Sequence, residues 1–446
     1  MTNPSSRRQF LGQAASLGIG LWSGGSVSSP VKAAPNDRLR FACIGLGAQG
    51  AADALAAARL GEVVALCDID DQVLQQRGAE EPFKNARRFQ DFRRLFEDFA
   101  EGLDAFIVST PNHLHFPAAI LGMRLGKSCF CQTPLAHSVT EVRQLAALAR
   151  ERKLATQMGN ASSTLSSQKR AAQLISSGIL GAIREVHAWT KRPTWPQGSG
   201  PRPAAGPVPD HLNWDLFLGP APARDFAPGA YLPGVWRGWW DFGSGALGDQ
   251  GCQLLDLPFR TLDLQAPTRI AAAHSGHDRE RYPVWSVIRY DFPQRGERGP
   301  VQLFWYDGGT RPSRELFLGR PVPASGVLIV GERDSLSIRE EPNFEFSLLH
   351  EGANTAPEPA VNEPAEGLFE EWIQAIRGGP PASSDFATFG GPLSETVLLG
   401  NLAVWVGQAP GQKGTIVEWD SASQSSPNLP ELTPLIQRPI REGWRL

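Results

Sequence analysis

A glycine-rich turn near the start of the chain is the first place where residue types and spacing predict chemistry. It lies between an apolar run at 39–44 and an alanine-rich run at 51–60, which are typical of a strand and a helix. Its residues are Gly45, Leu46, Gly47, Ala48, Gln49 and Gly50. In such a unit the glycines allow a tight bend and a close backbone approach, and free N–H groups at the helix start bind phosphate. The turn is therefore predicted to hold the pyrophosphate of a dinucleotide.

An acidic residue follows at the place where such a site needs one. A second apolar run, 63–67, is followed directly by Asp68. A carboxylate there accepts hydrogen bonds from the adenosine ribose and repels a 2′-phosphate. Asp70 is a neighbouring alternative for this role. The pattern predicts NAD as the cofactor, with NADP less favoured.

The nicotinamide end is expected where two later strand-like runs, 105–110 and 128–131, come to an end. The candidate residues at these ends are Thr110, Asn112, His115 and Gln132. Ligands of open parallel sheets lie at the carboxyl ends of the strands, so these side chains are predicted to bind the cofactor. We expect Pro111 to stop the first strand and open a loop. Asn112 and His115 in that loop could instead cap a helix.

Alternating strand-like and helical runs predict a Rossmann domain over 38–158. The chain has 446 residues, too many for one ordinary core, so 159–446 is predicted to form a second domain. A proline-rich segment within it, 193–233, has too many turn-forming residues for regular structure. We expect this segment to wrap the site or a neighbouring subunit.

Composition excludes several classes of protein. The net charge is −3 and no run of Lys or Arg stands out, so no nucleic-acid partner is expected. The five cysteines are odd in number and form no CxxC pair, which argues against a disulfide framework. The eight histidines are scattered without an HExxH pattern, so no metal site is predicted.

The first 34 residues are predicted to be a twin-arginine signal peptide. Ser6-Arg7-Arg8-Gln9-Phe10-Leu11 precedes a weakly apolar stretch at 14–27 and a small-residue cleavage site at 31–34. The stretch is too short and too rich in Gly and Ser to span a bilayer stably, and no later apolar run is long enough. We therefore expect an exported, periplasmic or extracytoplasmic protein without a membrane span after cleavage.

The glycine turn, the acidic residue after the second strand-like run and the strand ends that follow resemble those of the Gfo/Idh/MocA family of glucose–fructose oxidoreductases and inositol dehydrogenases. The likeness to its exported bacterial branch rests on 156–160, 239–243 and 245–249. The resemblance implies a Rossmann domain followed by an α+β domain with a large open, mainly antiparallel sheet. It implies that 159–446 is the C-terminal α/β domain for substrate binding and oligomerisation. It also implies an NAD(P)-dependent oxidoreductase acting on a sugar, cyclitol or related polyol, in a homo-oligomer.

The chain departs from the family at both places where catalysis is expected. The family motif Glu-Lys-Pro reads Gln132-Thr133-Pro134 here, so Thr133 replaces the lysine. A second family motif has an Asp and, four residues later, a His; here it reads Asp249 and Gln253. Neither Thr nor Gln titrates near neutral pH. Loss of a general base alone costs about 10²–10⁴ in rate.

Three interpretations follow. In the first, the protein is an oxidoreductase with Asp249 as the base and with Thr133 and Gln253 orienting hydroxyl groups; desolvation in tryptophan-rich surroundings would raise the basicity of the carboxylate. In the second, it cleaves or eliminates a glycosidic bond through transient oxidation. The acid or base candidates for that reaction are Tyr231, His211 and His137. In the third, it is a catalytically silent homologue that binds cofactor and carbohydrate. Asp249 could also be a helix cap or a structural ion pair.

Overall fold

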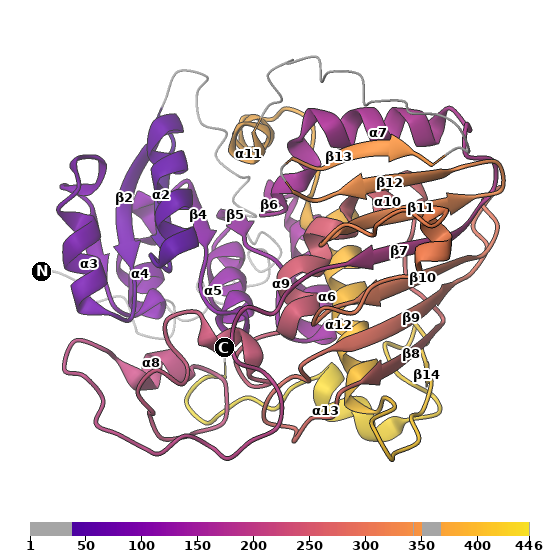
Figure 1. Cartoon of the computed structure of the whole chain (residues 1–446). Coiled ribbons are helices and arrows are strands. Elements are labelled where there is room, and N and C mark those ends of the chain that lie inside the picture. Colours follow the sequence, from indigo (N-terminus) through magenta and orange to yellow (C-terminus); the bar gives the residue numbers. More distant parts are fainter. Residues whose placement is uncertain (1–37, 342, 350–366, 446) are drawn as a thin grey trace, which may run out of the picture. The chain divides into compact units, whose positions relative to one another are not determined.

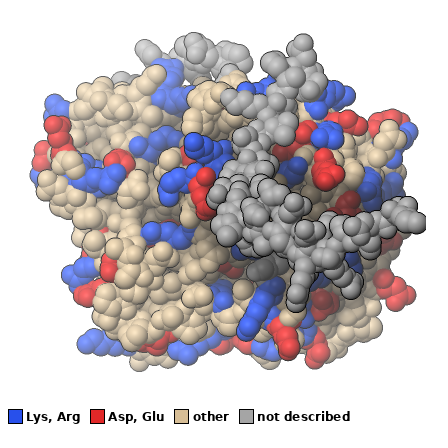
Figure 2. Space-filling view, turned by 180° about the vertical axis from the view of Figure 1, so that it is seen from behind, with Lys and Arg blue, Asp and Glu red and all other residues tan. Residues whose placement is uncertain are grey.

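The computed structural model describes residues 38–341, 343–349 and 367–445. The predicted signal peptide, 1–34, lies outside the described residues. Within these ranges no helix is both long enough and apolar enough to cross a membrane. Basic and acidic side chains are interspersed on the face shown in Figure 2.

A six-stranded parallel sheet forms the first domain, with strand order β3-β2-β1-β4-β5-β6. Its strands are β1 (Arg40–Ile44), β2 (Glu62–Cys67), β3 (Arg87–Phe89), β4 (Ala105–Val108), β5 (Ser128–Cys131) and β6 (Thr156–Met158). The connecting helices are α2 (Ala48–Leu60), α3 (Asp71–Gly78), α4 (Phe92–Phe99), α5 (Asn112–Arg124) and α6 (Val139–Arg152). The central strands are continuous apolar runs because helices cover both faces of a parallel sheet. The order reverses between β1 and β4, which places a ligand crevice at their carboxyl ends.

An eight-stranded sheet forms the second domain, in the order β13-β12-β11-β7-β10-β9-β8-β14. Its strands are β7 (Ile183–Trp189), β8 (Arg269–His274), β9 (Ser286–Phe292), β10 (Val301–Tyr306), β11 (Gly326–Gly331), β12 (Ser335–Arg339), β13 (Glu345–Leu348) and β14 (Val417–Glu418). Every pair is antiparallel except β7 with β10. The predicted fold class is confirmed.

Helices cover one face of this sheet, as Figure 1 shows for α9 and α12. The helices of this part are α7 (Ser166–Ser176), α8 (Trp214–Leu218), α9 (Gly245–Leu254), α10 (Asp256–Thr261), α11 (Leu368–Ile376), α12 (Gly391–Trp405) and α13 (Thr433–Ile436). Buried and half-buried residues alternate along β9, the pattern of a strand with only one face against the core.

The proline-rich part of the second domain reaches back to the first domain. We call residues 205–237 the strap. Its backbone bonds to the Rossmann domain, with Asp71 N–H donating to His211 O at 2.8 Å and Asn213 N–H donating to Ile69 O at 3.0 Å. It therefore lies against the carboxyl end of β2 and the start of α3. Part of the predicted segment 193–233 thus lies against the strand ends where the site is expected, and its contact with a neighbouring subunit stays a prediction. The expectation that the segment lacks regular structure is wrong at α8, which lies within it.

Helix α11 also returns to the Rossmann domain after the second sheet. Phe369 stacks on Phe130 with ring centroids 4.4 Å apart, and Trp372 stacks on Phe41 at 5.7 Å. Trp372 is fully buried, and its indole N–H donates to Ala155 O at 3.1 Å. One apolar cluster thus joins residues that are far apart in the chain.

Replacing Trp372 with Ala should destabilise the Rossmann domain strongly, because it removes a fully buried ring from that cluster. We expect the free energy of unfolding to fall by about 3–5 kcal/mol in denaturant titrations. The half-exposed Leu125 is the matched control, and Leu125→Ala should change stability by less than about 1 kcal/mol. Equal effects of the two substitutions would show that α11 does not stabilise the domain.

Candidate functional site: a cavity between the glycine turn and the strap

A cavity of about 650 Å³ lies where the glycine turn, the ends of β2 and β4, and the strap meet. Its volume is within the range of small-molecule sites. Of the residues predicted to bind the cofactor, those that line it are Gly45, Gly47, Ala48, Gln49, Gly50, Asp68 and Thr110. The strap contributes residues that include His211, Trp236 and Arg237.

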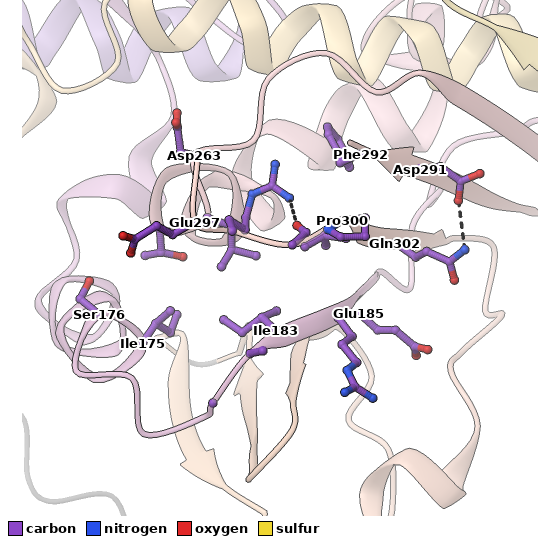
Figure 3. Close-up of a pocket in the computed structure, with 18 residues that line it drawn as sticks. Ile175, Ser176, Ile183, Glu185, Asp263, Asp291, Phe292, Glu297, Pro300 and Gln302 are labelled. Carbon is purple, nitrogen blue, oxygen red and sulfur yellow. Dashed lines mark hydrogen bonds between the residues drawn. The ribbon is translucent and has the colours of Figure 1, made fainter. Parts of the chain in front are cut away.

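A second, larger hollow of about 810 Å³ lies on the other domain, by the start of β7 and the loop between β9 and β10 (Figure 3). Some of its polar groups bond to one another: Gln302 donates to Asp291 at 3.1 Å and Arg298 donates to Gly299 O at 2.6 Å. It contains none of the residues that the sequence singles out. The smaller cavity is therefore the candidate site.

The glycine turn is shaped by two close approaches of the backbone. Gly45 has φ +84°, and a Cβ there would lie 2.7 Å from the carbonyl carbon of Ser109. A Cβ at Gly50 would lie 1.9 Å from Gly45 O. Neither position accepts a side chain without moving the backbone. The turn and the start of α2 are thereby pressed against the end of β1.

The start of α2 presents free donors to the cavity. Gly47 is the N-cap and supplies no side chain to the helix, whose first intrahelical bond runs from Ala51 N–H to Gly47 O. The N–H groups of Ala48, Gln49 and Gly50 have no partner within the helix. A Cβ on Gly47 would meet no atom within 4 Å. The open space and the donors together fit a pyrophosphate group.

Two of the carboxylates that line the cavity, Asp68 and Asp70, lie just after β2. Asp68 accepts hydrogen bonds from Leu46 N–H at 2.7 Å and Asp70 N–H at 3.0 Å, which ties the glycine turn to this strand end. Burial raises the pKa of Asp68. Asp70 caps α3 and also pairs with His211 Nδ1 at 2.9 Å. Both predicted ribose acceptors are therefore at the cavity, and the strap contacts the second of them.

Three predicted cofactor residues lie behind the cavity wall. Asn112 and His115 sit in the first turn of α5, so the prediction of a loop is wrong: Pro111 has φ −58° and caps a helix. His115 is buried, with its ring nitrogens 2.8 Å from Pro134 O and from Thr110 O. Gln132 donates to Asp53 at 2.8 Å. Their contact with a cofactor stays a prediction; in this structure they hold the ends of β4 and β5 in place.

The three predicted catalytic residues do not line the cavity, but one of them is linked to it. Asp249 accepts from Arg237 Nε at 2.6 Å and from Gln250 Nε2 at 2.8 Å. Arg237 lines the cavity, with its guanidinium 4.4 Å from the ring centre of Trp236. The structure thus forms the ion pair that the alternative interpretation of Asp249 expects. The carboxylate has a cationic partner rather than a purely apolar surrounding.

Of the other two catalytic candidates, Gln253 bonds through its side chain to the backbone, whereas Thr133 accepts a hydrogen bond at its own backbone carbonyl. Gln253 Nε2 donates to Gly159 O at 3.1 Å, and its Oε1 accepts from Ser162 N–H at 3.1 Å. Thr133 O lies 3.5 Å from the Asn112 side-chain amide, which donates to it. The amide of Gln253 is thus used to hold the segment after β6. Its contact with substrate, and that of the Thr133 hydroxyl, stays a prediction.

Of the acid or base candidates for glycosidic cleavage, only His211 lines the cavity. His137 is buried with Nε2 at 2.8 Å from Gly243 O, and burial lowers its pKa well below the ordinary value. Tyr231 is buried among the rings of Trp214, Trp239 and Phe242. Neither side chain is available to a ligand in this cavity.

Sequence reasoning missed Arg237, the guanidinium that joins the cavity to Asp249. It lies in a stretch without helical or strand periodicity, so no sequence pattern predicts which way its side chain faces. The signal that the sequence offers is compositional, because many of its tryptophans fall between Trp189 and Trp240. In the structure the guanidinium lies 5.7 Å from the ring centre of Trp195 and 4.4 Å from that of Trp236. Tryptophans around a lone arginine are typical of a cation held in place.

Replacing Gly45 with Ala should abolish tight dinucleotide binding. Positive φ costs about 1–2 kcal/mol for any L side chain, and at this position the Cβ also meets the Ser109 backbone. Gly126 is the matched control, because it has φ +76° with nothing within 4 Å of a Cβ. Calorimetry with NAD⁺ should show at least about tenfold weaker binding for Gly45→Ala and little change for Gly126→Ala. Unchanged binding by Gly45→Ala would contradict the assigned site.

Comparison with known proteins agrees with this architecture. The family model for the NAD-binding Rossmann fold of the Gfo/Idh/MocA oxidoreductases matches residues 39–160, and the model for the C-terminal alpha/beta domain matches 165–297. An inositol dehydrogenase homologue from Azotobacter vinelandii, solved with NAD⁺, is 19% identical with a TM-score of 0.58, covering 86% of this chain and 98% of that one. That likeness concerns the fold.

Curated relatives match over shorter stretches. A glycosyl hydrolase family 109 protein of Shewanella pealeana is 32% identical over 118 residues, which are 24% of this chain and 25% of that protein. A D-xylose 1-dehydrogenase [NADP(+)] of Haloarcula marismortui is 24% identical over 188 residues, 41% of this chain and 49% of that protein. The chain thus aligns with a quarter to about half of the length of these relatives. The two family models together cover more than half of the chain, and the protein belongs to the Gfo/Idh/MocA family of oxidoreductases.

Proposed function

We propose that the protein binds NAD(H) in the cavity beneath the strap and acts as an oxidoreductase on a sugar, cyclitol or related polyol. The observation that carries the proposal is the placement of the free N–H groups of Ala48, Gln49 and Gly50 in one cavity with Asp68. The helix start, which would bind the pyrophosphate, and the carboxylate, which would bind the ribose, can therefore contact the same dinucleotide. Family membership supports the redox chemistry.

The residues present fit the cofactor. The amides of Ala48 and Gln49 would hold the pyrophosphate, and Asp68 would hold the adenosine ribose. The nicotinamide ring, when bound, supplies the hydride acceptor or donor. The strap covers part of this end of the sheet, because the backbone of His211 and Asn213 bonds to the Rossmann backbone.

Local charge supports NAD over NADP. Asp68, Asp70 and Asp91 line the cavity at the ribose end. The nearby arginine, Arg93, is bound to Asp91 with Nη2 at 2.7 Å. A 2′-phosphate would meet carboxylates there with no free guanidinium offered by these residues. The preference remains a proposal, since a relative that uses NADP is similar over part of this chain.

The Asp249–Arg237 pair is the proposed reactive end of the site. Oxidation of an alcohol requires a group that takes the hydroxyl proton as the carbonyl forms. Asp249 would take this proton, while Arg237, held by two tryptophans, would keep the carboxylate oriented and bind the substrate oxygen. Thr133 and Gln253 would orient other hydroxyl groups.

A silent cofactor-binding protein is the second candidate. Two observations favour it: Asp249 is already paired, and both amide atoms of Gln253 bond to the backbone. Such a protein would bind NAD(H) with the same residues. It would differ only in the absence of turnover.

Turnover separates the two candidates. Purified protein would be mixed with NAD⁺ and a panel of sugars and cyclitols, and reduction followed at 340 nm. We expect reduction by at least one compound, and a fall of about 10²–10⁴ in kcat for Asp249→Asn with the affinity for NAD⁺ retained. The control is Asp263→Asn, which breaks an arginine pair remote from the cavity.

Other outcomes of these assays would favour the other two interpretations of the protein's function. Cofactor binding without turnover on any compound would favour the silent protein. Release of reducing sugar from glycosides without net change in the cofactor would favour glycosidic cleavage. Full activity of Asp249→Asn would remove this carboxylate from the role of base.

We also propose export by the twin-arginine route, on the sequence of residues 1–34 alone. This route carries folded proteins, so the cofactor would be loaded before export. Replacing Arg7 and Arg8 with Lys should leave the protein in the cytoplasm of a host with this pathway, measured by cell fractionation. The unchanged chain in the same host is the control, and equal export of both would contradict the proposal.

A further inference from the structure

Asp53 is a buried carboxylate in α2, one turn beyond the glycine turn. Only 4% of the surface of this residue is exposed to solvent. Its Oδ1 accepts from Gln49 Nε2 at 2.9 Å, and its Oδ2 accepts from Ser109 Oγ at 2.6 Å and from Gln132 Nε2 at 2.8 Å. Small apolar residues surround it along the helix, so a carboxylate here is not needed for packing.

The three donors belong to the structures that frame the cavity. Gln49 is in the turn, Ser109 follows β4, and Gln132 follows β5. Gln49 and Ser109 line the cavity themselves. Asp53 therefore lies directly behind the wall, at the strand ends where the nicotinamide half of a dinucleotide is expected.

All three partners of Asp53 are neutral. Within 38–341, 343–349 and 367–445, its bonds come from two amides and a hydroxyl, and no ion pair involves it. Burial raises the pKa of Asp53, while these three hydrogen bonds lower it. Its charge reaches its neighbours: the pKa values of Cys43 and Cys131 are raised by burial and, further, by Asp53. A carboxylate that lacks a cation in a low-dielectric interior acts over several ångströms.

We propose that Asp53 makes the site prefer the oxidised cofactor, NAD⁺, over NADH. This inference rests on the proposed binding of NAD(H). The nicotinamide ring is positively charged in NAD⁺ and neutral in NADH, whereas the pyrophosphate and both riboses are the same in the two. The negative charge of Asp53 therefore favours NAD⁺ selectively, and its repulsion of the pyrophosphate cancels in the ratio of the two affinities.

The test is the ratio Kd(NADH)/Kd(NAD⁺), measured by calorimetry on the purified full-length protein. For Asp53→Asn we expect this ratio to fall about tenfold relative to the unchanged protein. Binding of ADP-ribose, which lacks the ring, reports any general damage to the pyrophosphate site. Asp53→Ser removes the charge with a smaller side chain and replaces Asp53→Asn if that variant does not fold.

Two matched variants separate charge from hydrogen bonding. Asp53→Asn combined with Gln132→Glu moves the carboxylate across the 2.8 Å contact, and the ratio should recover towards that of the unchanged protein. Gln132→Met removes one donor and keeps the charge, so it should leave the ratio unchanged even if both affinities fall.

A ratio that stays within about twofold in the folded, neutral variants of Asp53 would overturn the inference and leave a purely structural role. Failure of the unchanged protein to bind NAD⁺ and NADH would overturn the proposed function instead. The two failures are therefore distinguishable in one set of titrations.

Discussion

The contact between Gly45 O and Gly50 is the constraint on which the site depends. A Cβ at residue 50 would lie 1.9 Å from that oxygen, so α2 begins closer to β1 than a side chain allows. This contact aims the first N–H groups of α2 at the end of the sheet. Asp68, bonded to Leu46 N–H, fixes the same turn from the side of β2. The backbone geometry for a pyrophosphate is thus set before any ligand binds.

The second domain completes the cavity that this turn begins. The strap bonds to the loop after β2 and to the start of α3 through the backbone of His211 and Asn213, and Arg237 of the strap lines the cavity. Helix α11 adds two aromatic side chains to the core under the first sheet. Since both domains supply walls, folding of the second domain and formation of the cofactor site are coupled. A ligand held there contacts groups from both halves of the chain.

The features that could be predicted from sequence are local. The glycine turn, Asp68 and the apolar strands depend on neighbours within one strand–helix unit, and periodicity identifies them. The features that escaped prediction join distant residues. The contact between Gln132 and Asp53 spans 79 positions, and an aspartate among alanines has the pattern of an exposed helix residue. Pro111 predicts the start of a loop because proline ends strands, but proline also stands at helix starts, and here it caps α5.

The catalytic residues also could not be predicted in full, because their contacts join residues that are far apart in the chain. The sequence predicts that Thr133 and Gln253 stand where the family motifs have Lys and His. Arg237, which we propose to act with Asp249, comes from the strap, where no sequence pattern predicts its position. The pairing of Arg237 with Asp249 keeps a charged group beside the cavity without a histidine or lysine.

A crystal structure of the protein grown with NAD⁺ would decide whether the dinucleotide binds in this cavity. We expect pyrophosphate density on the N–H groups of Ala48 and Gln49, the adenosine ribose at Asp68, and the nicotinamide ring at the ends of β4 and β5. An empty cavity at saturating NAD⁺, or a dinucleotide bound elsewhere on the molecule, would contradict it.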